Sequence, residues 1–329
     1  MNKCFKTMYN GVVNNPYISK LGELRLPCIG KLNSPATVNG GWSSVVNFQK
    51  ENFVAEIISS DNVTFTDGTT TLIGSTESVV SKDIQSNKNF VLSLSPKYGI
   101  KGLNFTTDAK SNIAIEPNFD FNKLGVLPNL ILLNMEKGFN GNIDYVLKNA
   151  KKLTSLAISG EVEFSVSSIS TVLHELRLTG ASNVKGTISE VAKIVNAKDW
   201  GQCVNNASIE GDLADVPANV FYINLPSKGV TWTKGKRNSG SILAINIDKG
   251  SSQHFVSHED VNNMFVDQST CTLDTNPSND THGGSILKIK VACPNNYTPS
   301  SEAQAAIRTL YGKGLTSIIV NGKDMDEYK

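Results

Sequence analysis

The sequence is poor in charged and aromatic residues. Charged residues make up 19% of the 329 residues and aromatic residues 7%, and 31 Lys and Arg nearly balance 30 Asp and Glu. Without a basic excess the chain lacks the electrostatic footprint of a nucleic-acid-binding protein, and it has no acidic tail for cations. Its polar surface must therefore consist largely of Asn, Ser and Thr, which suits an extracellular or particle-exposed protein.

Long apolar runs and cysteine pairs are also missing. No stretch reaches the roughly 18 consecutive apolar residues of a membrane span, and the opening MNKCFKTMYNGVVNN lacks the apolar core of a secretory signal. An odd number of scattered cysteines without a C-x-x-C pair predicts free thiols formed in a reducing compartment. These cysteines are Cys4, Cys28, Cys203, Cys271 and Cys293.

Motifs that carry chemistry are equally scarce. The sequence contains no G-x-S-x-G, no Walker A pattern and no G-x-G-x-x-G after an expected strand. We therefore predict a non-enzymatic protein with no catalytic residues, no cofactor and no metal. The alternative of a carbohydrate-active or metal-dependent enzyme would depend on His254, His258, Trp200 and Trp232.

Two histidines and one polar loop are the candidate metal ligands. His254 and His258 are four residues apart, as on one helix face, but they read H-F-V-S-H-E rather than H-E-x-x-H. Ser257, as a helix N-cap, would also place His254 outside the helix, so structural histidines are favoured. The loop DTNPSNDTHGG offers oxygen ligands for calcium, but its composition equally describes a plain turn, which we favour. Its candidate ligands are Asp274, Asn276, Asn279 and Asp280.

What the chain does contain is a leucine-rich pattern centred on residues 153–180. KLTSLAISG places Leu153, Leu156 and Ile158 before Gly160, VLHELRLTG repeats the pattern 20 residues later, and NLILLNM is an upstream copy. A period of about 20–23 residues is typical of leucine-rich repeats, in which each unit is a short strand plus a return segment. Stacked units share one core, so the pattern predicts a parallel solenoid.

The return segments carry a second regularity, a G-x-apolar triplet followed by helical spacing in two of three copies. Later strands are expected around Ile209 and at 220–225, with irregular spacing, so the solenoid is predicted to be degenerate. The triplets are Gly141-Asn142-Ile143, Gly186-Thr187-Ile188 and Gly211-Asp212-Leu213.

The predicted fold class is mixed α/β and β-rich, with four regions. Residues 1–35 form a short N-terminal docking arm, 36–120 a β-rich domain with one short helix at 75–87, 121–235 the solenoid, and 236–329 a β-α-β-α-β unit or cap. In the last region Ser257 and either Ser300 or Ser301 are expected to cap the two helices.

The arm includes the strand ELRLPCI, which ends near Pro27. Because a strand bounded by proline at a chain terminus is usually an edge strand, two interpretations stay open. The strand pairs with its own N-terminal sheet, or it adds to the sheet of a neighbouring protein. In the second case the candidate partner-binding residues are Tyr17, Leu21, Leu24, Leu26 and Ile29.

The loop 227–241 is the one basic run of the chain. A basic loop with an aromatic residue suits contact with phosphates or a sugar, whereas a solvated linker between domains is the simpler interpretation. Trp232, Lys234 and Arg237 are its candidate exposed contacts.

The repeats resemble a known group of proteins. LTSLAISG, HELRLTG and the interleaved GNI and GTI are similar to degenerate leucine-rich repeats of gut Bacteroidetes and their phages, over about a third of the chain. Cys4 follows no apolar run, so the lipoprotein leader normal for the bacterial surface members is not expected. The opening NNPYISKLGELRL also looks like the N-terminal arms of virion appendage proteins in crAss-like phages.

The resemblance implies a non-enzymatic structural protein of a bacteriophage virion, such as a head fibre or tail appendage component. It would be made in the host cytoplasm, form a homo-oligomer, dock on other virion proteins through its arm and expose its repeats to a host glycan or protein. Neither nucleic acid nor membrane insertion is implied. The alternative is a leucine-rich-repeat module for protein–protein interaction in a gut bacterium.

Overall fold

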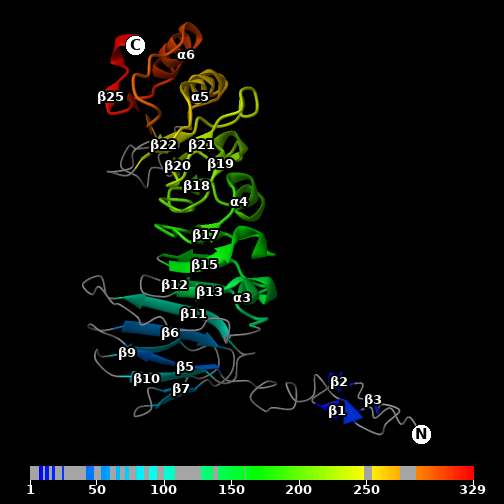
Figure 1. Ribbon diagram of the computed structural model, residues 1–329. Coiled ribbons are helices and arrows are strands. Elements are labelled where there is room, and N and C mark those ends of the chain that lie inside the picture. Colours follow the sequence, from blue (N-terminus) through cyan, green and yellow to red (C-terminus); the bar gives the residue numbers. More distant parts are fainter. Residues whose placement is uncertain are drawn as a thin grey trace.

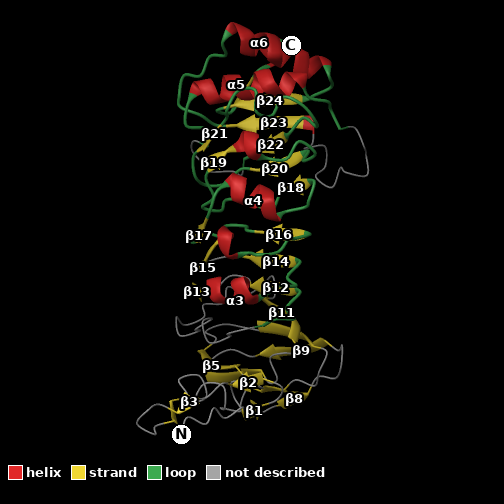
Figure 2. Ribbon diagram, turned by 90° about the vertical axis from the view of Figure 1, so that its right-hand side faces the viewer, coloured by secondary structure: helices red, strands yellow, loops and turns green. Residues whose placement is uncertain are grey.

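The computed structural model describes residues 100–104, 127–135, 141–159, 161–247, 254–274 and 287–329 in full, and elsewhere only the backbone of strands. The fold is mixed α/β, with short, largely parallel strands stacked along one axis (Figure 1). Four helices lie in the described residues: α3 (Asp144–Asn149), α4 (Ile188–Ile194), α5 (His258–Thr270) and α6 (Ser301–Gly312). Figure 2 shows α3 and α4 along one side of the stack and α5 and α6 at its C-terminal end.

The first of two six-stranded sheets, here called the first ladder, holds the leucine-rich pattern. Its parallel part ends at β11, which pairs antiparallel with β6, so one sheet continues across the predicted boundary at residue 120. In spatial order the strands are β16 (Glu175–Arg177), β14 (Ser155–Ile158), β12 (Leu132–Met135), β11 (Ile100–Thr107), β6 (Phe53–Ser59) and β9 (Val79–Ile84).

The expected helix at 75–87 is wrong. Val79–Ile84 forms strand β9, which pairs antiparallel with β6 over six residues. The two β-branched residues Val79 and Val80 favour extended backbone, and the partner strand supplies the hydrogen bonds that a short isolated helix would have to make alone.

The second ladder contains the strands of the C-terminal half. Its first five strands are parallel, and the order strand, α5, strand, α6, strand confirms the predicted β-α-β-α-β unit. Asn321 and Gly322, both at positive φ, turn the chain back into a two-residue edge strand that ends the sheet. The strands are β18 (Asp199–Trp200), β20 (Tyr222–Asn224), β22 (Ala244–Asn246), β23 (Lys288–Val291), β24 (Ser317–Val320) and β25 (Lys323–Asp324).

Further short strands lie on the return side, the side reached after each ladder strand. Here β13 (Asn140–Asn142), β15 (Glu161–Ser165) and β17 (Val184–Lys185) are parallel, as are β19 (Gly211–Asp212) and β21 (Val230–Thr231). Short 3-10 turns lie at Val166–Ser168, Leu213–Asp215 and Asp326–Tyr328. The remaining strands form antiparallel pairs: β1 (Thr7–Tyr9) with β2 (Val12–Asn14), β3 (Tyr17–Ile18) with β4 (Leu24–Arg25), β5 (Trp42–Asn47) with β10 (Asn89–Leu94), and β7 (Thr64–Thr66) with β8 (Thr71–Ile73).

Each parallel strand of the two ladders points at least one buried side chain into a shared core. Because strand side chains alternate between two faces, the residues next to each inward residue face out onto what we call the strand face. The inward residues are at most 2% exposed and stack in register: Leu133, Leu156 and Leu176 in the first ladder, and Trp200, Ile223, Ile245, Ile289 and Ile318 in the second.

The expected helix starts are confirmed. Thr187 and Glu190 form a reciprocal capping box at α4. Ser257 accepts from the Asp260 amide at α5, and Ser300 accepts from the Ala303 amide at α6. These local signals therefore fix where the chain leaves the strand and begins the return segment.

Candidate functional site

The stack is interrupted between β16 and β18, the terminal strands of the two ladders. A bridge between Leu173 and Val195 closes one end of the interruption, and a 2.9 Å bond from the Leu178 amide to the Gln202 carbonyl closes the other. Leu173 and Leu178, which flank β16, are five positions apart in the sequence, whereas Val195 and Gln202 are seven positions apart. The two extra residues form a bulge in the second segment, and β18 pairs with β20 rather than with β16.

Beside the bulge lies a recess of about 360 Å³ on the strand face, lined by both polar and apolar residues. A second recess of about 280 Å³ adjoins it, and Arg177 and Gln202 line both. The first is also lined by His174, Glu175, Ala197, Asp199, Gly201 and Cys203, and the second by Asn134, Ala157, Ser159 and Thr179. Together they form a continuous polar surface across the coils of β12, β14, β16 and β18.

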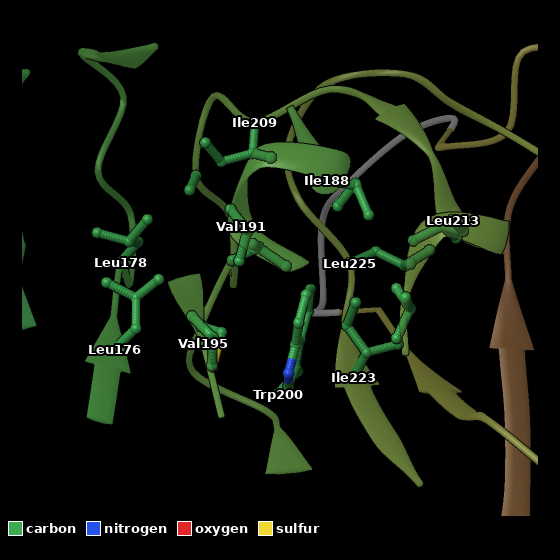
Figure 3. Close-up of a cluster of buried hydrophobic side chains, with 14 of the residues drawn as sticks. Leu176, Leu178, Ile188, Val191, Val195, Trp200, Ile209, Leu213, Ile223 and Leu225 are labelled. Carbon is green, nitrogen blue, oxygen red and sulfur yellow. The ribbon is translucent and has the colours of Figure 1, made fainter. Parts of the chain in front are cut away.

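Trp200 anchors the floor beneath this surface. Its ring is fully buried, its indole Nε1 donates to the Ala197 carbonyl at 3.2 Å, and Figure 3 shows it between Val195 on one side and Ile223 and Leu225 on the other. A Cβ at Gly201 would come within 2.9 Å of the Tyr222 ring. A large inward residue followed by glycine therefore holds the bulge in place while keeping the recess open.

Glu175 is a charged residue of the recess with a hydrogen-bond donor on each carboxylate oxygen. Its Oε2 accepts from Ser155 Oγ at 2.6 Å and its Oε1 accepts from Arg177 Nε at 2.7 Å. The Ser155 hydrogen bond, helped by Arg177, lowers the pKa of Glu175 against the opposing effect of burial. The carboxylate is therefore ionised and already neutralised by its own neighbours.

Cys203 lies at the floor of the same recess but is no nucleophile. Burial, followed by the nearby carboxylates of Asp199 and Glu175, raises its pKa to about 12, and only the thiolate reacts. Cys203, Cys271 and Cys293 are buried free thiols, as predicted, whereas Cys4 and Cys28 lie outside the described residues.

The prediction that Trp232 and Arg237 are exposed contacts is wrong. Trp232 is 2% exposed and donates from Nε1 to Asp267 at 2.9 Å, and Arg237 is 3% exposed and donates to the backbone carbonyls of Val216 and Val220. The loop folds back because α5 offers a buried carboxylate to the indole. Burial lowers the pKa of Arg237 to about 10.

Lys234, the third predicted contact, lies at the surface. Its side chain is 48% exposed and pairs with Glu302 at 2.8 Å. Such exposed pairs contribute little to stability. Lys228 and Lys236 of the same loop are similarly exposed and also pair with carboxylates, so the loop keeps three cations at the surface.

The two candidate zinc ligands point to different backbone carbonyls. His254 is buried and hydrogen-bonded through Nδ1 to Pro226 O at 2.8 Å, and His258 contacts Pro294 O through Nε2 at 2.8 Å. Across the part of the chain that the structure describes, no three His, Cys, Asp or Glu residues gather as a metal site. Of the predicted loop ligands Asp274 is described, and Asn276, Asn279 and Asp280 are not.

In the arm, the structure describes only the backbone of short strands. Tyr17–Ile18 pairs antiparallel with Leu24–Arg25, so the arm contains a two-stranded hairpin. The side chains of Tyr17 and Leu24, and all of Leu21, Leu26 and Ile29, lie outside the described residues. Docking through these residues stays a prediction.

Sequence reasoning missed the residues that make the recess. The pattern placed a ladder strand around Ile209, whereas the chain uses Asp199–Trp200 for that strand, and Ile209 packs before β19 on the return side. The usable signal was the period, because Trp200 follows Leu176 by 24 residues. This spacing does not stand out in the sequence, because the pattern is defined by leucine and the position here is occupied by a single tryptophan.

Fold and site together define a mixed α/β protein with a stack of parallel strands and a polar recess on its strand face. No family model matches the chain, and comparisons with characterised proteins and with solved structures give no match either. None of the described helices combines the length and apolar character needed to cross a membrane.

Proposed function

We propose that the chain is a non-enzymatic, leucine-rich-repeat-like solenoid that binds a partner on its strand face. The observation that carries this proposal is the register of inward residues along both ladders, which leaves a regular row of outward side chains for contact. Solenoids use such extended surfaces for recognition. The recess at Arg177 and Gln202 supplies a concave site on this row.

We further propose that the protein is a structural component of a bacteriophage virion, a head fibre or tail appendage, held by residues 1–35. The support is the likeness of its opening segment to virion arms and the low charge of its surface. The β3–β4 hairpin is compatible with strand addition to a neighbour. In this role the arm binds other virion proteins while the repeat surface faces outward.

A bacterial interaction module is the second candidate, favoured by the C-terminal end of the stack. There the short strand β25 closes the sheet, and the helix α6 lies at the same end of the stack (Figure 1). A capped end is what a self-contained repeat protein needs for solubility.

The molar mass of the full chain and of a chain lacking residues 1–30, measured by light scattering, separates these functions. The virion proposal predicts an oligomer that becomes a folded monomer on truncation. A monomer in both cases, with no binding of the full chain to particle proteins, would contradict the arm and leave the interaction module as the function.

A further inference from the structure

The two recesses differ from the rest of the described strand face in holding neutral polar side chains that the protein does not use itself. Ser159, Thr179 and Gln202 follow three successive ladder strands and line the second recess. Within the described residues none of these side chains takes part in an intramolecular hydrogen bond, although Asn134, Asn224 and Asn246 on the same face do. Two hydroxyls and one amide are therefore available to a ligand, each able to donate and accept.

The charged side chains Glu175, Arg177 and Asp199 of the first recess already have partners within the protein. Both oxygens of Glu175 are occupied, by Ser155 and by Arg177, and Asp199 accepts from the Gly201 amide. The same ion pair uses Nε and Nη2 of Arg177 and leaves Nη1 as a donor. An uncharged ligand can accept from Nη1 and leave this ion pair intact.

From this placement we infer, on the basis of the proposed binding role, that the recesses bind a neutral, hydroxyl-rich ligand, namely an uncharged oligosaccharide. Vicinal hydroxyls match the mixed donor and acceptor set of Arg177, Thr179, Gln202 and Ser159. Ser159 and Thr179 follow two paired strands, which lie about 4.8 Å apart. Gln202 continues this row across the interruption, so a linear ligand lying along the stack meets a neutral polar group at each of three coils.

The same geometry predicts weak binding at each site. The residues that line the two recesses include no Phe, Tyr or Trp, so the sugar rings find no aromatic surface on which to stack. Affinity then depends on hydrogen bonds, each of which adds little net free energy in water. An oligomer that presents several recesses would bind a multivalent surface far more tightly than one chain binds a single glycan.

The test uses the full chain and a panel of immobilised neutral oligosaccharides of hexoses, N-acetylhexosamines and deoxyhexoses. Sialylated glycans and a lysine-rich peptide form the comparison arms. We expect binding to at least one neutral member, with little change between low and high salt because no ion pair forms. Gln202→Ala and Thr179→Ala should each weaken that binding about tenfold.

Lys290→Ala is the matched control, because Lys290 faces outward in the second ladder, away from both recesses. Binding of no neutral glycan, binding that the recess variants leave unchanged, or salt-sensitive binding of the peptide alone would overturn the inference. These results are independent of the arm-deletion experiment, so the ligand class can fail while the virion role stands, and the reverse.

Discussion

Gly240 occupies a position that no other residue fits. Its φ is 87°, in the left-handed region, and a Cβ there would lie 2.3 Å from the carbonyl oxygen of Ala218. We expect Gly240→Ala to lower the free energy of unfolding by about 2–4 kcal/mol, the sum of backbone strain and overpacking. Urea denaturation followed by circular dichroism measures this change.

Gly235 provides the control for that prediction. Its φ of 82° is nearly the same, but no atom lies within 4 Å of its Cβ position. Gly235→Ala should therefore cost only the strain, about 1 kcal/mol. Equal losses in the two variants would mean that the contact with Ala218 is not tight.

His254 makes stability depend on pH. Burial lowers the pKa of His254 below its usual 6.5, only partly offset by the bond to Pro226 O. Among the residues that the structure describes, its buried Nε2 has no hydrogen-bond partner. The unfolded chain thus binds more protons than the folded one at acidic pH, so the free energy of unfolding should be constant above about pH 6.5 and fall as the pH drops below it.

Thermal unfolding between about pH 5 and pH 7 measures this slope. His254→Gln should flatten the slope, whereas His174→Gln, a substitution at the exposed rim of the recess, should leave it unchanged. A slope that persists in His254→Gln would assign the pH dependence to other groups.

At the scale of elements, the interruption should be the least protected part of the described parallel strands. Alternation along β16 directs the Leu176 amide toward β18, where pairing is lost, while the Leu178 amide one step further reaches Gln202. We expect the Leu176 amide and residues 196–201 to exchange hydrogen faster than β14, which is paired on both sides. Exchange measured by NMR would contradict this if Leu156 and Leu176 were equally protected.

Elements with strong local signals could be predicted from the sequence, and elements defined by their neighbours could not. LTSLAISG and HELRLTG gave β14 and β16, and the capping residues Ser257 and Ser300 gave the starts of α5 and α6. The strand β18 was missed because its inward residue is Trp200 rather than leucine. The recess was missed for the same reason. A two-residue bulge can be recognised only when its segment is aligned with the neighbouring strand, and the sequence does not provide that alignment.

The buried loop around Trp232 shows the same limit for the candidate site. A basic run with an aromatic reads as exposed, and Lys234 is exposed. Trp232 and Arg237 are buried because of Asp267 and of carbonyls more than 15 residues away, and no local pattern in the loop encodes those partners. Burial of a polar side chain is decided by the partner that satisfies it.

At the scale of the whole molecule, the two ladders are neighbouring units coupled through one irregular coil. Repeat stacks unfold as one unit only while the interfaces between neighbours are strong, and Trp200 provides much of the buried contact at this interface (Figure 3). Trp200→Ala should cost about 3–5 kcal/mol and, because the loss falls at the junction, should let the two ladders unfold at different urea concentrations.

Hydrogen exchange with mass spectrometry along a urea series follows peptides from residues 141–185 and 210–329 separately. Trp232→Ala removes a side chain of the same size, also buried, from the return side after β21, where it contacts Asp267 of α5 away from the junction. This variant should lower stability, but because the junction is intact, the two sets of peptides should lose protection at more similar urea concentrations than in Trp200→Ala. If Trp200→Ala and Trp232→Ala unfold with the same separation between ladders, the interrupted coil is not the point where cooperativity is set, and coupling must pass through the return side, where Thr187 bridges Glu210.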